Sequence, residues 1–123
     1  MRVILNEAAL QRDVGGREVM VRQLHHLIKM AELPDITIQI LPFTVGYHPT
    51  MESSFSLLRF PQTPVMDCVF IDVKGGVMYI EKPSNVARYV EDFSRLATDF
   101  AAQESHTKDL LHKEIERRGG DRY

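Results

Sequence analysis

The sequence contains five histidines and one cysteine, residue types that ligate metals in proteins, but their spacing does not suit a metal site. His25 and His26 are adjacent in a predicted helix, where neighbouring side chains point about 100° apart and cannot share one tetrahedral ion. His106 and His112 are six residues apart, which places them on different sides of a helix. Neither a Cys-x-x-Cys nor a His-x-x-x-His pattern occurs. We therefore expect no metal and no cofactor.

The nucleophilic residues also lack the surroundings that catalysis requires. Cys68 begins the apolar run Cys-Val-Phe-Ile, and no basic neighbour in the sequence would lower the pKa of its thiol, so it is expected to be a small core residue. No Gly-x-Ser-x-Gly elbow is present. The glycine pairs Gly15-Gly16 and Gly75-Gly76 lack the lysine and the spacing of a phosphate loop, and they are typical of turns. The sequence predicts a protein that is not an enzyme.

One loop, residues 44–53, combines aromatic and polar residues at a length that mildly favours a functional loop. Its candidate binding residues, together with the aromatic residues that flank it, are Phe43, Tyr47, His48, Glu52 and Phe55. Such a group could line a pocket for a ligand or a partner. In the alternative interpretation, Gly46 and Pro49 shape a turn and the aromatic side chains fill the edge of the core.

The composition is that of an ordinary globular domain. The chain has 123 residues, of which 44% are hydrophobic and 26% are charged, a size and composition suited to one folded domain. The net charge of −2 argues against the broad basic surface of a nucleic-acid-binding protein. A single cysteine excludes an intrachain disulfide, and no apolar stretch approaches the length of a signal peptide core or a membrane span. We expect a cytoplasmic protein with no membrane contact.

Hydrophobic periodicity predicts an α+β fold with the element order β-α-β-β-β-β-α-α. Strands are predicted over 3–5, 36–41, 55–60, 68–73 and 77–81, and helices over 17–32, from 83 to about 100, and over 104–118. The first two strands and the helix between them favour a parallel crossover. We expect a single domain with a mixed sheet of about five strands covered by helices. Residues 1–103 would form the core, and residues 104–123 would add a C-terminal helix and tail to the same domain.

The C-terminal helix carries a narrow apolar stripe of Leu110, Leu111 and Ile115 among charged residues. Two interpretations stay open: the stripe packs on its own domain, or it is an interaction helix for docking or dimerisation. A third, weaker interpretation makes Arg117 and Arg118 a nucleic-acid patch.

Several short motifs resemble one family in their order and spacing. They are Asn6-Glu7-Ala8-Ala9-Leu10, Val14-Gly15-Gly16, Gln23-Leu24-His25-His26-Leu27, Ala31-Glu32-Leu33-Pro34, Ile38 to Phe43, Gly46-Tyr47-His48-Pro49 and Phe55 to Pro61. Over most of residues 2–105 the chain resembles the C-terminal domain of unknown function of actinobacterial Xre-type helix-turn-helix regulators. The resemblance implies a regulator that reads DNA through an N-terminal helix-turn-helix and senses a signal or a partner through this region. It also implies a small partner protein encoded nearby, and no established enzymatic activity.

The chain itself contains no helix-turn-helix, so DNA binding would come only through a segment absent from it. We expect either a fragment of such a regulator or a natural short protein. Apolar residues alternate onto both faces of the predicted sheet, and an uncovered apolar face usually marks an interface, which favours a homodimer or a cleft closed by another segment. The leading hypothesis is a sensory or protein-interaction domain. The alternatives are a stand-alone small-molecule-binding protein or weak enzyme that uses the 44–53 loop, and a purely structural dimerisation module.

Overall fold

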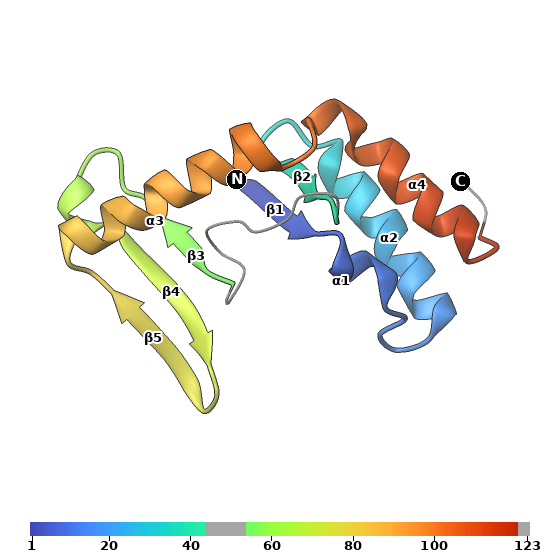
Figure 1. Cartoon of the computed structure of the whole chain (residues 1–123), viewed down its shortest axis with the longest axis horizontal. Helices are drawn as coiled ribbons and strands as arrows, with labels where there is room; N and C mark the ends of the chain where they lie inside the picture. Colours follow the sequence, from blue (N-terminus) through green and yellow to red (C-terminus); the bar gives the residue numbers. More distant parts are fainter. Residues whose placement is uncertain (44–53, 121–123) are drawn as a thin grey trace. The chain divides into compact units, whose positions relative to one another are not determined.

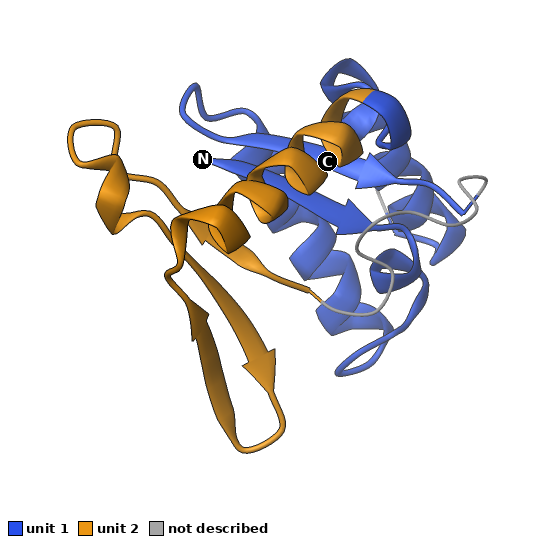
Figure 2. Cartoon of the chain, turned by 60° about the vertical axis from the view of Figure 1, so that its left-hand side comes forward, with its two compact units in different colours: residues 1–46, 99–123 blue, residues 47–98 orange. Residues whose placement is uncertain are grey.

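The computed structural model describes residues 1–43 and 54–120 of the chain, and it confirms the predicted α+β class (Figure 1). The chain divides into two compact units (Figure 2). Unit 1 comprises residues 1–46 and 99–123, and unit 2 comprises residues 47–98. The predicted core of residues 1–103 therefore spans both units, whereas the C-terminal helix belongs to unit 1.

Unit 1 is built on the predicted parallel crossover. Strand β1 (Arg2–Asn6) pairs in parallel with β2 (Thr37–Leu41), and α1 (Ala8–Gln11) and α2 (Arg17–Ala31) lie between them in the chain. The Asn6 side-chain oxygen accepts a hydrogen bond from the Ala8 N–H (2.9 Å), as expected of a residue that precedes a helical turn. The register that begins with Arg2 opposite Thr37 runs without interruption to the end of both strands.

The core of unit 1 joins this sheet to two helices. Helix α4 (Thr107–Arg117), preceded by the short helical turn η3 (Glu104–His106), lies alongside α2 (Figure 1). The buried core residues are Leu10, Met20, Leu24, Ile28, Ile38, Ile40, Leu111 and Ile115. Met20, Leu24 and Ile28 recur at four-residue steps on α2, which gives this helix the apolar stripe that its sequence predicts.

Unit 2 is an antiparallel sheet covered by a helix. Its strands are β3 (Ser56–Leu58), β4 (Cys68–Val73) and β5 (Gly76–Ile80), in the order β3-β4-β5, and a short helical turn, η1 (Pro64–Met66), precedes β4. Helix α3 (Pro83–Arg95) begins with a proline, which fits the first turn because its missing N–H has no partner there. Its continuation, η2 (Leu96–Phe100), leads the chain back to unit 1.

The turn between β4 and β5 is displaced by one residue from the predicted Gly75-Gly76 position. Val73 pairs with Gly76, so the two turn residues are Lys74 and Gly75. Gly75 has a φ of 91°, a value that side chains disfavour and that a tight hairpin requires. Gly76 is the first residue of β5.

The expectation of one mixed sheet is wrong, because the five strands in residues 1–43 and 54–120 form two separate sheets. The reason lies at the edge of β2 that faces away from β1. The Ala102 N–H donates a hydrogen bond to the Ile40 carbonyl oxygen (2.8 Å), and the Thr107 hydroxyl donates to the Ile38 carbonyl oxygen. Between them, the Gln39 side-chain amide donates to the Ala102 carbonyl oxygen (3.2 Å). The carbonyl groups that a third strand would use are therefore already occupied.

A buried arginine attaches the C-terminal helix to the start of the chain. The Arg118 side chain is only 1% exposed and donates hydrogen bonds to the Asp13 carboxylate (2.6 Å), the Leu10 carbonyl oxygen (2.6 Å) and the Glu114 carboxylate (3.2 Å). Glu114 also accepts a hydrogen bond from the Gln11 side chain (2.7 Å). Because a buried charge is tolerated only when its hydrogen bonds are satisfied, this network fixes the end of α4 against α1.

Replacing Arg118 is predicted to destabilise unit 1 far more than replacing its neighbour. Arg118→Met removes a buried partner of Glu114 and is expected to lower the free energy of unfolding by about 3 kcal/mol. Arg117→Met is the matched control, because Arg117 binds the same Glu114 carboxylate at 2.9 Å but is half-exposed. That change is expected to cost less than about 1 kcal/mol. Urea unfolding measures both, and equal losses would contradict the structural role of Arg118.

The stability is also expected to depend on the ionisation of Asp13. The hydrogen bond from Arg118 lowers the pKa of the Asp13 carboxyl below its ordinary value. A lowered pKa in the folded state stabilises the protein above the unfolded-state pKa of about 3.9, and the effect is lost as the pH falls through the folded-state pKa. We expect Asp13→Asn to be less stable than the wild type at neutral pH, with a difference that shrinks below about pH 4. Thermal unfolding across this range measures the difference, with Asp35→Asn at an exposed position as the control.

Candidate interaction surface

The predicted binding residues around the 44–53 loop fall only partly within the described residues. Tyr47, His48 and Glu52 lie outside them. Phe43 follows β2 in unit 1, with an exposed side chain and a backbone N–H that donates to the Glu7 carboxylate (2.7 Å). Phe55 belongs to the other unit. Phe43 and Phe55 thus belong to different units, and the loop that joins them lies outside the described residues.

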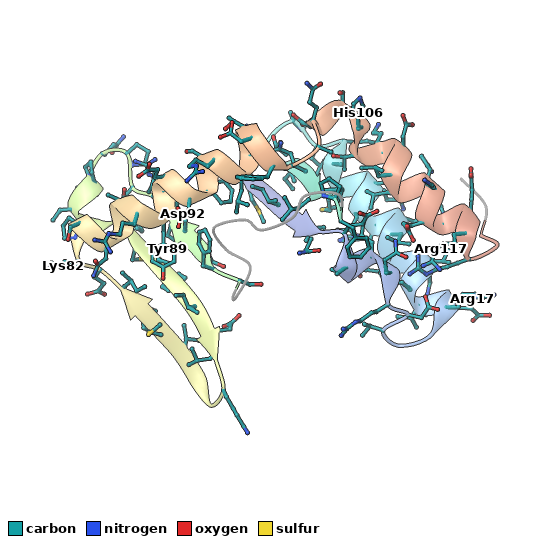
Figure 3. The ribbon with its side chains drawn as sticks, viewed as in Figure 1. Arg17, Lys82, Tyr89, Asp92, His106 and Arg117 are labelled. Atoms are coloured by element: carbon teal, nitrogen blue, oxygen red, sulfur yellow. The ribbon has the colours of Figure 1, made fainter. Side chains whose placement is uncertain are left out.

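Phe55 instead contributes to the aromatic part of the unit 2 core. Its ring contacts Tyr89 edge-on with 5.1 Å between ring centroids, and Phe93 with 6.3 Å. Figure 3 shows Tyr89 on α3, from which it packs against the core cluster. For Phe55, the alternative interpretation in which aromatic side chains fill the core edge agrees with these contacts.

The apolar stripe of α4 is also part of a core. Leu111 and Ile115 are completely buried, and Leu110 is partly buried against the same cluster, because α4 packs on α2 and β2. These side chains are not displayed to a partner, so their burial corrects the interpretation of this helix as an interaction helix. Arg118 is buried as well, which leaves no basic patch formed by Arg117 and Arg118 together.

The register of the unit 2 sheet separates its side chains into two faces. Val69 and Ile71 of β4 pack with Val86 of α3 in the core, and Leu57 and Ile80 lie against this cluster. Directly opposed residues of antiparallel strands share a face, so the pairs Leu58–Cys68, Phe70–Tyr79 and Asp72–Val77 lie on the other side. We call the apolar members of this second side the open face; they are Leu58, Cys68, Phe70, Val77 and Tyr79.

The open face remains substantially exposed. The exposed fractions are 44% for Leu58, 46% for Val77 and 62% for Tyr79. The rings of Phe70 and Tyr79 meet edge-on with centroids 5.0 Å apart, which gives the face an ordered aromatic pair. Contiguous apolar surface of this kind is typical of a contact site for another protein.

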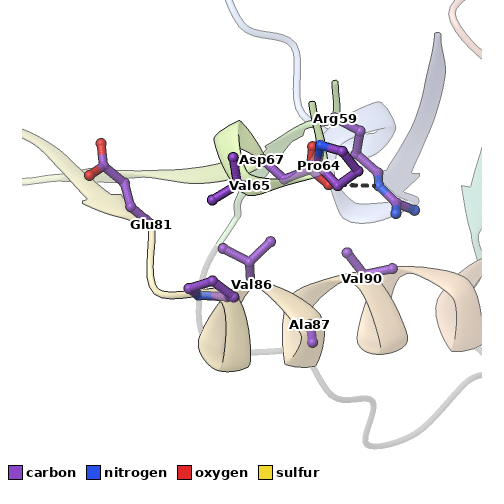
Figure 4. Close-up of a pocket in the computed structure, with 9 residues that line it drawn as sticks. Arg59, Pro64, Val65, Asp67, Glu81, Val86, Ala87 and Val90 are labelled. Atoms are coloured by element: carbon purple, nitrogen blue, oxygen red, sulfur yellow. Dashed lines mark hydrogen bonds and ion pairs between the residues drawn. The ribbon is translucent and has the colours of Figure 1, made fainter. Parts of the chain in front are cut away.

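A small cavity of about 210 Å³ lies between η1 and α3 in unit 2 (Figure 4). Its apolar walls are formed by Pro64, Val65, Pro83, Val86, Ala87 and Val90. At one end the Arg59 side chain pairs with the Asp67 carboxylate (3.4 Å), which also accepts the Phe60 N–H (2.6 Å). Ligand pockets usually measure roughly 300–1,000 Å³, so this cavity suits a single amino-acid side chain better than a metabolite.

Residues 1–43 and 54–120 hold no group of three or more His, Cys, Asp or Glu side chains that could bind a metal ion. Within the same ranges, no helix is both long and apolar enough to cross a membrane. Cys68 is partly exposed on the open face rather than fully buried, which differs from its expected place in the core.

A model of a domain of unknown function, DUF5753, matches residues 1–113. The chain belongs to the DUF5753 family. The match covers unit 2 completely and most of unit 1, so a DUF5753 domain includes both sheets. It ends within α4, before Glu114, Ile115 and Arg118, which complete the core and the buried network of unit 1. Comparison with curated proteins found no match, and comparison with solved structures found none either.

The sequence predicts an uncovered apolar face of the sheet, but it does not group the residues that form the open face. The β5 strand reads Gly-Val-Met-Tyr-Ile, with apolar residues at successive positions, whereas a strand with one solvated face alternates apolar and polar residues. The pairing register was needed to show that Leu58 of β3 shares a face with Phe70 and Tyr79.

Two neighbouring leucines of β3 provide a direct test of this division. Leu57→Ala removes a side chain that packs in the core and is expected to lower the unfolding free energy by about 2 kcal/mol. Leu58→Ala truncates a side chain of the open face and is expected to change stability by less than about 0.5 kcal/mol. Chemical denaturation of both variants measures the difference. A larger loss in Leu58→Ala would show that the open face is a core surface.

Proposed function

We propose that this DUF5753 chain is the C-terminal sensory or protein-interaction domain of an Xre-type transcriptional regulator, and that it acts in the cytoplasm by binding rather than by catalysis. DNA would be contacted by a helix-turn-helix outside this chain. The partners would be a second copy of the chain and a small protein encoded nearby. The motif resemblance supports the regulatory role, and the net charge of −2 is consistent with leaving DNA contacts to another segment.

The observation that carries the proposal is the open face. A three-stranded sheet with one helix on it needs to bury only one face, so apolar side chains on the second face have no role in the core of unit 2. Leu58, Phe70 and Tyr79 nevertheless occupy that face. Burying exposed apolar surface stabilises an association by roughly 25 cal/mol per Å², before the cost of association. The face is therefore a suitable contact surface for a protein partner.

The cavity beside α3 supports a binding role in the same unit. Its size suits one side chain, and the neighbouring Val65 and Met66 are exposed. Protein partners commonly insert a single anchoring side chain into a preformed cavity of this kind. This cavity is smaller than the usual site for a metabolite, and the 44–53 loop is the segment that the alternative hypothesis assigns to metabolite binding.

Binding of the purified product of an adjacent gene to the full chain tests this function by calorimetry. We expect a complex that Leu58→Lys weakens at least about tenfold, because the substitution places a charge at an apolar contact. Val14→Lys is the matched control, since Val14 is 71% exposed and belongs to unit 1. A second readout is the unfolding free energy, which a partner at ~100 times its Kd should raise by about 2.7 kcal/mol.

Two results would contradict the proposal. The first is a pair of negative results: no product of an adjacent gene binds in calorimetry, and no metabolite stabilises the chain in a thermal-shift screen. Together they would favour a purely structural module. The second is equal affinity of Leu58→Lys and Val14→Lys, which would exclude the open face. The reading frame upstream of the chain provides an independent test, since the proposal requires a helix-turn-helix in that frame.

A further inference from the structure

Strand β5 forms an edge of the unit 2 sheet and has none of the usual protection. In the described sheet it pairs only with β4, through five consecutive one-to-one pairs from Val73–Gly76 to Val69–Ile80. Proteins commonly protect such edges with prolines, charged side chains or bulges, because an unpaired edge invites another strand. Residues Gly76–Ile80 contain no proline and no charged residue, and their one-to-one pairing with β4 contains no bulge.

The turn determines which backbone groups of β5 face outward. In a two-residue hairpin the closing pair, here Val73 and Gly76, exchanges hydrogen bonds, and bonded and non-bonded pairs then alternate along the strands. Gly76, Met78 and Ile80 therefore direct their N–H and C=O groups toward β4. Val77 and Tyr79 direct theirs away from the sheet, where they are available to another strand.

We propose that β5 pairs with β5 of a second copy of this chain, antiparallel and about a two-fold axis at Met78. The proposal rests on the proposed function, in which a second copy is one of the partners, and it assigns that partner to a specific edge. Val77 would exchange main-chain hydrogen bonds with the partner's Tyr79, and Tyr79 with the partner's Val77. The two three-stranded sheets would join into one continuous sheet.

A second copy fits this edge because the strand is self-complementary. About Met78, the β-branched Val77 lies opposite the partner's aromatic Tyr79, a favourable cross-strand pair that the symmetry repeats. Gly76 lies opposite the partner's Ile80, so the smallest side chain faces a large one. No two charges meet within the strand, because the nearest charged residues, Lys74 and Glu81, lie beyond its ends.

The charges at the two ends agree with the antiparallel direction. Lys74 is in the turn at the beginning of β5, and Glu81 follows its last residue. Antiparallel pairing about Met78 puts Glu81 opposite the partner's Gly75, one residue from the partner's Lys74. Lys82 follows but leaves the strand as the residue that caps α3. A parallel arrangement would instead place identical charges side by side at each end.

The exposed area predicts a weak dimer. Val77, Met78 and Tyr79 are 46%, 47% and 62% exposed, which corresponds to roughly 300 Å² of side-chain surface per copy. Two copies would bury less than the ~1,200 Å² of a standard interface, so we expect dissociation in the micromolar range. Most of the affinity would come from main-chain hydrogen bonds, and the alternate side chains would give the specificity, as in other cases of strand addition.

Sedimentation velocity of the full chain over a range of micromolar concentrations tests the association. We expect a reversible monomer–dimer equilibrium that Val77→Lys weakens at least about tenfold, because a charge on an edge strand opposes pairing. Val14→Lys is the matched control, because Val14 is 71% exposed but belongs to unit 1, outside the sheet that carries β5. Far-ultraviolet circular dichroism confirms that each variant is folded. A wild-type chain that stays monomeric at high micromolar concentration overturns the proposal, as does equal weakening in both variants.

A cysteine at the symmetry axis tests the register without depending on a destabilising variant. In the proposed dimer, residue 78 faces its own copy in a non-bonded pair, with Cα atoms about 4.5 Å apart, within the range that a disulfide can bridge. In a Cys68→Ala background, Met78→Cys should form a covalent dimer under mild oxidation, whereas Val14→Cys, at an exposed position of unit 1, should not. Equal cross-linking at the two positions overturns the register.

Amide hydrogen exchange separates strand pairing from other contacts. At high concentration the amides of Val77 and Tyr79 should gain protection, while those of Gly76 and Met78, already bonded to β4, should change little. A dimer without this alternation would be formed by the open face rather than by the edge, which overturns the proposal. The outcomes also separate this inference from the proposed function. Binding of an adjacent gene product by a strictly monomeric chain would retain the function and reject the edge pairing, whereas self-association without any other binding would do the reverse.

Discussion

The fold depends on how the outer edge of β2 is closed. The carbonyl oxygens of Ile38 and Ile40 accept hydrogen bonds from the Thr107 hydroxyl and the Ala102 N–H, so the segment that follows η2 occupies the position of a third strand. Backbone polar groups that are buried must find partners, and these contacts satisfy them with a segment more than sixty residues away in the chain. They also place Thr107 at the start of α4, where the helix can continue along α2 and complete the core of unit 1.

Closing this edge has a consequence for unit 2. Its strands cannot pair with β2 at that edge, and in the structure they form a sheet of their own with α3 against one face. One amphipathic helix presents one apolar stripe and can cover only one side of a sheet. The apolar side chains on the second side, from Leu58 to Tyr79, therefore stay outside the core. The surface that carries the proposed function follows from a separate sheet that a single helix covers.

Local sequence patterns predicted most of the helices and strands, because these elements form from the spacing of residues that are close together in the sequence. The four-residue recurrence of Met20, Leu24 and Ile28 identified α2, and β-branched residues identified β2. The partition into two sheets could not be predicted in this way, since it depends on Thr107 and Ala102 meeting β2. Gln39 shows the same limit. In a strand that alternates apolar and polar residues, Gln39 would face solvent between Ile38 and Ile40, yet it is buried and bonded to Arg2 and Ala102.

The sequence predicted that the protein has an apolar interface, but it assigned the specific contact residues to elements other than the strands of the open face. Apolar residues on both strand faces indicated an interface, and the sequence placed specific residues in the 44–53 loop and on α4. Leu111 and Ile115 form a narrow apolar stripe on a charged helix, a composition that suggests a helix at the surface. The charged side chains of Glu114 and Arg118 on this helix are nevertheless buried, in a network with Asp13. Charge in a sequence thus does not establish exposure. In this chain an internal ion network fixes the C-terminal helix, while apolar strand residues remain at the surface. The proposed recognition therefore relies on apolar contact and main-chain pairing, in which selectivity comes from register and shape rather than from a charged field.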